Sequence, residues 1–213
     1  MSDEPSWSSG RPRPNGWTKR EGVTRFQNPW ISVVEHSAVA PTGIETQYAV
    51  LRFHKFAVAA LPVHADGTIS LVGQHRFPFD QWSWELPEGG VPFSESALEG
   101  AKRELREETG LTAAHWREVL NLQFSNSITD EVGTCFLAWD LEQGETEFDE
   151  TEDLHLVRVP FRELLAEISA GRVRDAMTVA TALKAYHMAR EGELPDALAR
   201  AMLGQAPQAE ETA

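Results

Sequence analysis

Apolar and polar residues alternate through the first half of the chain in a way that favours strands. The segments rich in Val, Ile, Leu and Phe are 31–39, 45–53, 56–63 and 68–74. His64-Ala-Asp-Gly67 separates the last two and is typical of a hairpin turn. A Trp-rich segment, 81–87, follows. We therefore predict strands in these segments, with 56–63 and 68–74 paired as a hairpin.

The second half of the chain alternates between helical and strand patterns. A helix is predicted at 96–109, with Ser96 and Glu99 as a capping box and Gly110 as the residue that ends it. Strand candidates follow at 116–124, 134–141 and 154–160, and helix candidates at 161–170 and 176–190. Strands, a helix, strands and then helices predict an α/β (α+β) fold, in which a mixed β-sheet is sandwiched between helices.

Composition shifts along the chain divide it into four parts. Residues 1–20 contain Ser, Gly, Pro and Arg without periodicity, and we interpret them as a disordered lead-in. Residues 21–55 are expected to form an N-terminal antiparallel β extension, and 56–192 the main domain. Residues 193–213 are expected to be a flexible C-terminal tail with one weak helix candidate.

The helix predicted at 96–109 carries carboxylates beside its apolar stripe. At about 100° per residue, Glu104 and Glu108 border the arc that includes Leu105. Acidic side chains in the last turn oppose the helix dipole, at a cost of about 0.3–1 kcal/mol each. A bound divalent cation would reverse that cost, because hard cations bind carboxylate oxygens. An ordinary amphipathic helix with ion pairs explains the same geometry, so helix geometry alone leaves both interpretations open.

Charge and composition exclude several classes of protein. The 213 residues carry a net charge of −14, which argues against a nucleic-acid partner because a polyanion is normally met by a basic face. The negative charge does not exclude a small phosphate substrate, because bound divalent metals can reverse the sign of the local electrostatic field. No apolar run approaches the roughly 18 residues of a membrane span, and the N-terminus lacks a secretory pattern. With Cys135 as the sole cysteine, we expect a cytoplasmic protein.

The spacing around the helix decides between the two interpretations. Gly89, five residues, Glu95, seven residues, Arg103-Glu104-Leu105, then Glu107-Glu108 and Gly110-Leu111 match all nine specified positions of the Nudix box. Flanking segments, among them LVGQHRFP and WELPEGG, resemble the ADP-ribose pyrophosphatase and nucleoside-diphosphate-sugar hydrolase branch of that superfamily. The resemblance covers roughly residues 22–190 and implies a Nudix fold, with 56–192 as the Nudix hydrolase domain.

The resemblance also implies a metal centre. Its ligands would be three box glutamates and one main-chain carbonyl: Glu104, Glu108, Glu107 and the carbonyl of Glu88. Arg103 would pair with Glu95 to orient this set, and the motif glycines would be Gly89 and Gly110. The implied cofactor is Mg²⁺, with Mn²⁺ as a substitute, because two or three such ions can clamp a diphosphate and activate water. The Glu88 side chain would add an acid where relatives commonly have alanine.

Other residues are implied to act on the substrate or on the attacking water. Glu131 corresponds to a mobile-loop glutamate that some relatives use as a base or extra ligand; the alternative is a solvated loop acid. Arg76 resembles a phosphate-contacting arginine, and the alternative is a surface arginine at a strand end. Glu85 would contact the nucleoside. Trp30 and Trp84 could stack a base, although tryptophans at strand ends commonly serve packing.

The implied reaction is metal-dependent hydrolysis of a diphosphate bond in a nucleoside diphosphate-linked substrate. ADP-ribose or another nucleotide sugar would give a nucleoside monophosphate and a sugar phosphate. The alternatives are a house-cleaning pyrophosphohydrolase of nucleoside triphosphates and a non-catalytic Nudix sensor of nucleotide sugars. The apolar strands of 21–55 would have unpaired edges, which promote aggregation, so we expect a homodimer formed through that extension. No nucleic-acid or membrane partner is expected.

Overall fold

The computed structural model describes Trp7, residues 16–145 and residues 153–205. These residues form two compact units. The first unit runs to Phe53 and includes the loop Ser127–Asp130, whereas the second comprises His54–Asn126 and the chain from Glu131 onward. Most of the predicted lead-in and residues 206–213 of the predicted tail lie outside the described residues.

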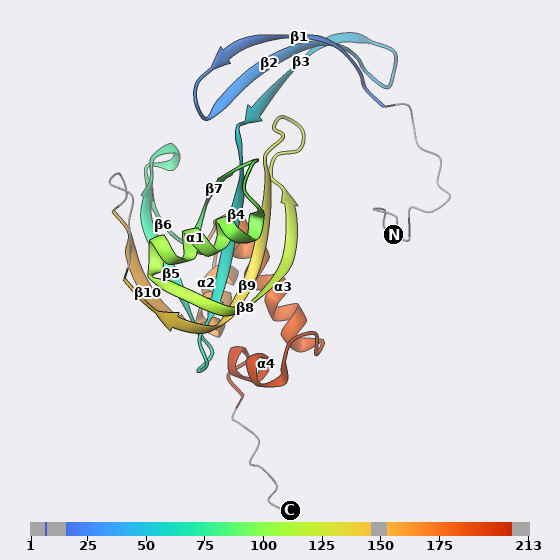
Figure 1. The fold of residues 1–213 in the computed structure, drawn as a ribbon. Coiled ribbons are helices and arrows are strands. Elements are labelled where there is room, and N and C mark those ends of the chain that lie inside the picture. The colour runs from blue at the N-terminus through green and yellow to red at the C-terminus, as the bar shows by residue number, and fades with distance from the viewer. Residues whose placement is uncertain (1–6, 8–15, 146–152, 206–213) are drawn as a thin grey trace, which may run out of the picture. The chain divides into compact units, whose positions relative to one another are not determined.

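The first unit is a three-stranded antiparallel sheet in the order β1-β2-β3 (Figure 1). Its strands are β1 (Thr18–Gln27), β2 (Ile31–Val39) and β3 (Glu45–Phe53). This confirms the predicted N-terminal antiparallel extension. Strand β1 begins at Thr18, inside the segment interpreted as a lead-in, and every residue of it is exposed. Because β1 is held by pairing with β2 and not by burial, hydrophobic periodicity gave no signal for it.

The loop Ser127–Asp130 returns from the second half of the chain and binds β3. The Leu51 N–H donates to the Ile128 carbonyl at 2.9 Å, and Leu51 and Thr129 form a parallel bridge. The Asp130 carboxylate accepts from the Phe53 N–H at 3.0 Å and from Arg52 at 2.8 Å. Main-chain pairing and a partly exposed ion pair therefore attach a distant loop to the extension.

The second unit contains a seven-stranded mixed sheet. Five strands follow the order β10-β5-β4-β9-β8, while β6 pairs with β5 and β7 with β4. Strands β4 and β9 are parallel and all other pairs are antiparallel. The strand bounds are β4 Lys55–Val63, β5 Thr68–Arg76, β6 Gln81–Glu85, β7 Glu88–Pro92, β8 Leu111–Gln123, β9 Val132–Gln143 and β10 His155–Pro160. A short 3-10 turn, Phe77–Phe79, joins β5 to β6.

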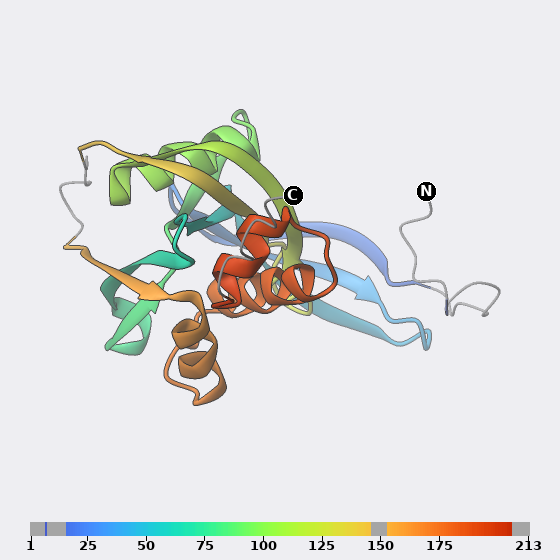
Figure 2. The same ribbon diagram turned by 90° about the horizontal axis from the view of Figure 1, so that it is seen from below.

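Helices cover both faces of this sheet, as Figures 1 and 2 show. The helices are α1 (Ala97–Thr109), α2 (Phe161–Ser169), α3 (Ala176–Arg190) and α4 (Asp196–Met202). Successive side chains of β4 point to opposite faces of the sheet. Ala59 and Leu61 belong to the core cluster that contains Met177 of α3, whereas Val58 packs with Ala101 of α1. This arrangement confirms the predicted mixed sheet between helices.

The hairpin predicted at His64–Gly67 is confirmed, and β4 and β5 diverge beyond it. Gly67 has a φ of +79°, and the His64 N–H donates to the Thr68 carbonyl at 2.8 Å. Only Val63 and Ile69 are in register between β4 and β5. Further along, β4 pairs with β7 and β5 pairs with β6. The segment that joins β6 to β7 therefore crosses between the two diverging strands.

The C-terminal helices complete the core on the side of α3. Leu198 and Met202 of α4 are buried in the large core cluster. A Cβ at Gly67 would lie 1.9 Å from the Ala201 carbonyl oxygen, so α4 lies directly against the β4–β5 turn. This differs from the flexible tail expected from residue 193, because one short apolar face gave only a weak helical pattern. No helix among the described residues is long and apolar enough to cross a membrane.

Candidate active site

The predicted helix at 96–109 is confirmed and is well capped at both ends. Ser96 is the N-cap, and its side chain accepts from the Glu99 N–H at 3.2 Å. The Glu99 carboxylate bonds to Lys102 at 2.8 Å, so half of the predicted capping box forms. Gly110 ends the helix at a φ of +70°, and its N–H donates to the Arg106 carbonyl. These caps, together with burial of the apolar stripe, hold α1 in register against the sheet.

Two box glutamates of α1 lie against the main chain at the start of β7. The Glu88 N–H donates to Glu108 Oε2 at 3.1 Å, and Glu108 is only 3% exposed. A Cβ at Gly89 would lie 2.3–2.4 Å from the carboxylate atoms of Glu104. Only glycine at this position lets the Glu104 carboxylate approach so closely. The Nudix-box glycine and the helix glutamates therefore form one arrangement in space.

Arg103 connects the acidic residues around it. Its Nη1 donates to Glu104 at 2.8 Å and to Glu107 at 3.0 Å, and its Nη2 lies 3.5 Å from Glu95. Burial lowers the pKa of Arg103, but Glu104 and Glu107 raise it more, so the guanidinium stays charged. The expected contact with Glu95 is present but long. The closer contacts hold two carboxylates that would otherwise repel each other.

A second group of charged residues lies at the ends of β5, β6 and β7. Arg76 Nε donates to both oxygens of Glu85, at 2.9 and 3.0 Å, and its Nη2 also contacts Glu85. The same Nη2 lies 3.0 Å from Glu88 Oε1. Glu85 is 2% exposed, whereas the Arg76 side chain is 38% exposed. Arg76 therefore compensates a buried carboxylate while part of its side chain remains accessible to solvent.

Asp175 completes this second group. Its Oδ2 accepts from the Thr178 N–H at 2.8 Å and caps α3. Oxygen atoms of Glu85, Glu88 and Asp175 lie within 4.8 Å of one another. Burial, followed by the charges of Asp175 and Glu85, raises the pKa of Glu88 well above its ordinary value. Asp175 immediately precedes the helix predicted at 176–190, but nothing in its local sequence pattern indicated a place beside Glu88.

Three further candidate residues are Glu131, Trp84 and Trp30. Glu131 is partly buried, immediately before β9, and burial raises the pKa of its carboxyl. Trp84 packs against the core, and its ring lies against Gly73 and at 5.8 Å from the ring of Trp82. Trp30 is 67% exposed in the first unit. Trp84 thus packs on the core, while base stacking by Trp84 or Trp30 and a catalytic role for Glu131 stay predictions.

The α1 carboxylates suit a divalent metal. They offer oxygen donors alone, which hard cations such as Mg²⁺ and Mn²⁺ prefer. Glu108 is nearly buried, and Glu104 is 13% exposed. Two acids so poorly hydrated at one helix end are costly without compensating charge, and Arg103 supplies one such charge to Glu104. The fit therefore rests on the chemistry and burial of the donors.

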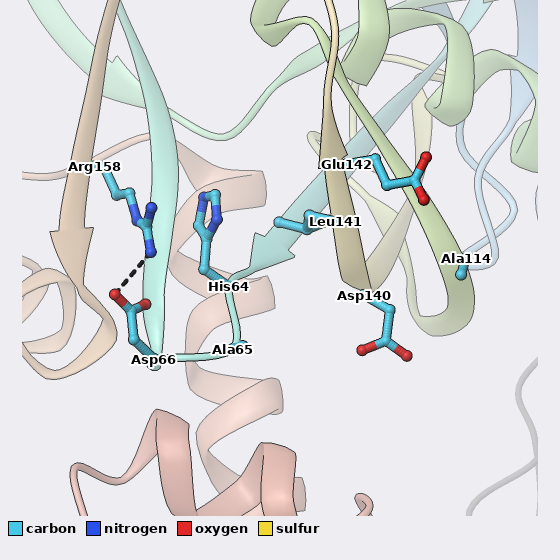
Figure 3. Close-up of a pocket in the computed structure, with 8 residues that line it drawn as sticks. All are labelled: His64, Ala65, Asp66, Ala114, Asp140, Leu141, Glu142 and Arg158. Carbon is cyan, nitrogen blue, oxygen red and sulfur yellow. Dashed lines mark hydrogen bonds and ion pairs between the residues drawn. The ribbon is translucent and has the colours of Figure 1, made fainter.

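A cavity of about 530 Å³ opens beside the β4–β5 turn, at the end of these strands away from the carboxylates of α1 (Figure 3). It is lined by His64, Ala65, Asp66, Ala114, Asp140, Leu141, Glu142 and Arg158. Arg158 bonds to Asp66 at 2.7 Å across its rim, as the dashed line in the figure marks. None of the candidate catalytic or metal residues lines this cavity, so it is a separate feature of the fold.

Comparison with known proteins places this site in a family. A family model for the NUDIX domain matches residues 53–179. An ADP-ribose pyrophosphatase of Bacillus subtilis is 30% identical over 155 residues, which span 72% of this chain and 83% of that protein. An ADP-ribose pyrophosphatase of Mycobacterium tuberculosis is 32% identical over 147 residues, or 68% of this chain and 70% of that protein.

A solved structure shows the same fold. The crystal structure of an ADP compounds hydrolase aligns with a TM-score of 0.77 at 20% identity, over 86% of this chain and all of that one. The box glutamates of α1 lie together against Glu88 and Gly89, within the segment that the family model matches. The chain therefore belongs to the Nudix family and is a Nudix pyrophosphohydrolase.

Proposed function

We propose that the chain hydrolyses the diphosphate bond of a nucleoside diphosphate linked to a second group, namely ADP-ribose or another nucleotide sugar, in the presence of Mg²⁺. The single observation that carries this proposal is the approach of Glu104 and Glu108 to the main chain of Glu88 and Gly89. The relatives named ADP-ribose pyrophosphatase support the substrate class.

Three glutamates and one carbonyl would hold the metal: Glu104, Glu108, Glu107 and the main-chain carbonyl of Glu88. When bound, Mg²⁺ neutralises the diphosphate and lowers the pKa of the attacking water. Arg103 bonds to Glu104 and Glu107, and so keeps their oxygens directed to one side of the helix end. Removal of Arg103 would therefore loosen the ligand set without removing a ligand.

The reaction requires a water molecule, a base and a positioned diphosphate. The water oxygen bonds to one phosphorus, the bridging P–O bond breaks, and the two products are a nucleoside monophosphate and a sugar phosphate. Glu131 is the proposed acceptor of the water proton, because its raised pKa brings a carboxylate closer to the range in which a base works at neutral pH. Arg76, held by Glu85, would contact a phosphate oxygen through the exposed part of its side chain.

A substrate panel tests the proposal. ADP-ribose, GDP-mannose, UDP-glucose and dGTP are each incubated with the protein and Mg²⁺, and the products are separated by chromatography. We expect cleavage of a nucleotide sugar to two monophosphates, and hydrolysis in ¹⁸O-water identifies the phosphorus attacked. Glu108→Gln, purified in parallel, controls for contaminating hydrolases. Pyrophosphate released from dGTP as the dominant activity would instead assign the chain to the house-cleaning class.

We also propose that the chain is a homodimer formed through its first unit. Strand β1 is exposed along its whole length, and large apolar side chains are exposed on or beside the sheet: Trp17, Val23, Phe26, Trp30 and Ile44. Within the described residues, the outer edge of β1 is unpaired. A second copy of the chain would cover both the edge and the apolar side chains.

A further inference from the structure

A second carboxylate cluster lies outside the Nudix helix. Glu85 ends β6, Glu88 begins β7, and Asp175 caps α3. One oxygen from each lies within 4.8 Å of the other two. A single position can therefore lie within about 2.8 Å (4.8/√3) of all three oxygens. Calcium–oxygen distances are about 2.3–2.6 Å, so closure by a few tenths of an ångström forms a coordination site.

The charges of this cluster do not balance by themselves. Glu85, Glu88 and Asp175 bring three negative charges, and Arg76 is the cation that bonds to two of them. If all four groups are ionised, their charges sum to −2. Glu88 Oε2 is buried and has no hydrogen-bond partner among the described residues, although Glu88 Oε1 reaches Arg76. A buried carboxylate oxygen without a partner is costly, and one divalent cation would neutralise the group and bind that oxygen.

The register of β7 separates this cluster from the metal ligands of α1. Glu88 pairs with Ala59, which packs in the core cluster with Met177 of α3. Gly89 pairs with Val58, which packs with Ala101 of α1, and Gly89 faces Glu104. Because successive strand residues point to opposite faces, the Glu88 side chain leaves β7 on the side away from Glu104. The two sets of carboxylates therefore share a main-chain segment but use different side chains.

The geometry points to a divalent-cation site formed by the side chains of Glu85, Glu88 and Asp175, separate from the carboxylates of α1. Its ligands come from two strand ends and one helix cap, so the cation joins β6, β7 and α3. Arg76 bonds to both oxygens of Glu85 and to Glu88 Oε1, and each of these oxygens has a second lone pair that a cation could use. The site does not depend on which nucleotide the enzyme hydrolyses.

Mn²⁺ binding counted by electron paramagnetic resonance tests the site on the full-length chain after removal of metals with a chelator. The variant Glu104→Gln/Glu108→Gln removes the principal α1 ligands, and we expect it to retain one Mn²⁺ per chain. Addition of Glu88→Gln to this background should abolish that binding, because Gln keeps the shape and the main-chain carbonyl but removes the charge. Glu167→Gln changes a partly exposed acid that is paired with Arg172; it is the matched control and should leave Mn²⁺ binding unchanged.

A second variant guards against misfolding. Asp175→Asn keeps an oxygen that can accept from the Thr178 N–H, so α3 stays capped while the charge is lost. In the Glu104→Gln/Glu108→Gln background it should weaken Mn²⁺ binding at least 10-fold, with an unchanged far-ultraviolet circular dichroism spectrum. The site is refuted if the background variant binds no Mn²⁺, or if Glu88→Gln and Asp175→Asn both leave its binding intact. Hydrolysis is not measured, so failure of the proposed substrate class would leave this result unaffected.

Discussion

The Glu88 N–H donates a hydrogen bond to Glu108 Oε2 at 3.1 Å, which joins the first residue of β7 to the last turn of α1. The bond orients one oxygen of a carboxylate that is 3% exposed. A hydrogen bond to a charged acceptor contributes about 1.5–3 kcal/mol. The sheet therefore positions the helix glutamate, and the metal ligands proposed for α1 depend on β7 as much as on the helix.

Glu104→Gln and Glu108→Gln should each lower Mg²⁺-dependent hydrolysis at least ~100-fold, because metal-ion catalysis needs their charge. Glu99→Gln is the matched control, since Glu99 is an exposed acid of the same helix that bonds Lys102. Without metal, both active-site variants should stay folded, because acids near a helix C-terminus are unfavourable and a Gln oxygen at position 108 can still accept from the Glu88 N–H. Near-normal turnover by Glu108→Gln, or full activity in a chelator, would exclude the metal assignment.

Gly89→Ala should impair catalysis while the fold survives. A Cβ at this position meets the Glu104 carboxylate at 2.3 Å, and that flexible end must move away. A displacement of about 1 Å in a reacting site can cost ~10²-fold in rate, so we expect a loss of at least ~10-fold. At Gly90 a Cβ meets only the flexible side chain of Lys55, at 3.1 Å. Gly90→Ala should therefore stay close to normal, and equal kinetic losses in both variants would contradict the proposed role of Gly89.

Asp66 should contribute to stability in a pH-dependent manner. Hydrogen bonds from the Thr68 hydroxyl, from Arg158 and from the Thr68 N–H lower the pKa of Asp66 below its ordinary value of 3.8. Because the folded-state pKa is the lower one, the contribution is present above pH 3.8 and is lost as the pH falls through the folded pKa. Asp66→Asn should therefore lower the melting temperature more at about pH 7 than at about pH 3. Arg158→Gln removes the same ion pair and should show the same trend; a loss that does not vary with pH in either variant would contradict it.

Assembly through the first unit predicts a measurable mass. Light scattering should give twice the 23.7 kDa chain mass at micromolar concentration. Phe26→Glu places a charge among the exposed apolar side chains of β1 and should raise the dimer dissociation constant at least 10-fold, because burial of an unpaired charge is costly. Leu183→Glu changes an equally exposed apolar residue of α3 and serves as the control. A wild-type monomer with full activity would refute the dimer.

The sequence predicted those parts of the site that are local along the chain. Ser96, Gly110 and the box spacing together predicted the extent of α1, because caps and periodicity act within a few residues. The same motif included Gly89 and Glu104, and the structure shows in addition that the Glu104 carboxylate lies against Gly89. Residues that the fold brings together from distant segments were not predictable in this way. Asp175 lies near Glu88 only because α3 packs on the face of β4 that includes Ala59, the strand partner of Glu88, and no local pattern predicts that packing.

Two other differences have physical causes of the same kind. Strand β1 is stabilised by pairing with β2 while its side chains stay exposed, so it shows no alternation of buried and exposed positions. Strand β7 contains two consecutive glycines, which disfavour strands by intrinsic preference. Its pairing with β4 and the close approach of Glu104 outweigh that preference, and this approach requires glycine at position 89.

The contact between Gly67 and the Ala201 carbonyl has a practical consequence for anyone who shortens, tags or splits the chain. Helix α4 covers the β4–β5 turn and contributes Leu198 and Met202 to the core. Truncation of the chain before Asp196 would therefore expose the apolar core residues that α4 covers. Such a truncated protein should precipitate on expression. A purification tag or a fluorescent fusion joined after Gln205 leaves the helix in place, so that position is the safer junction for engineering.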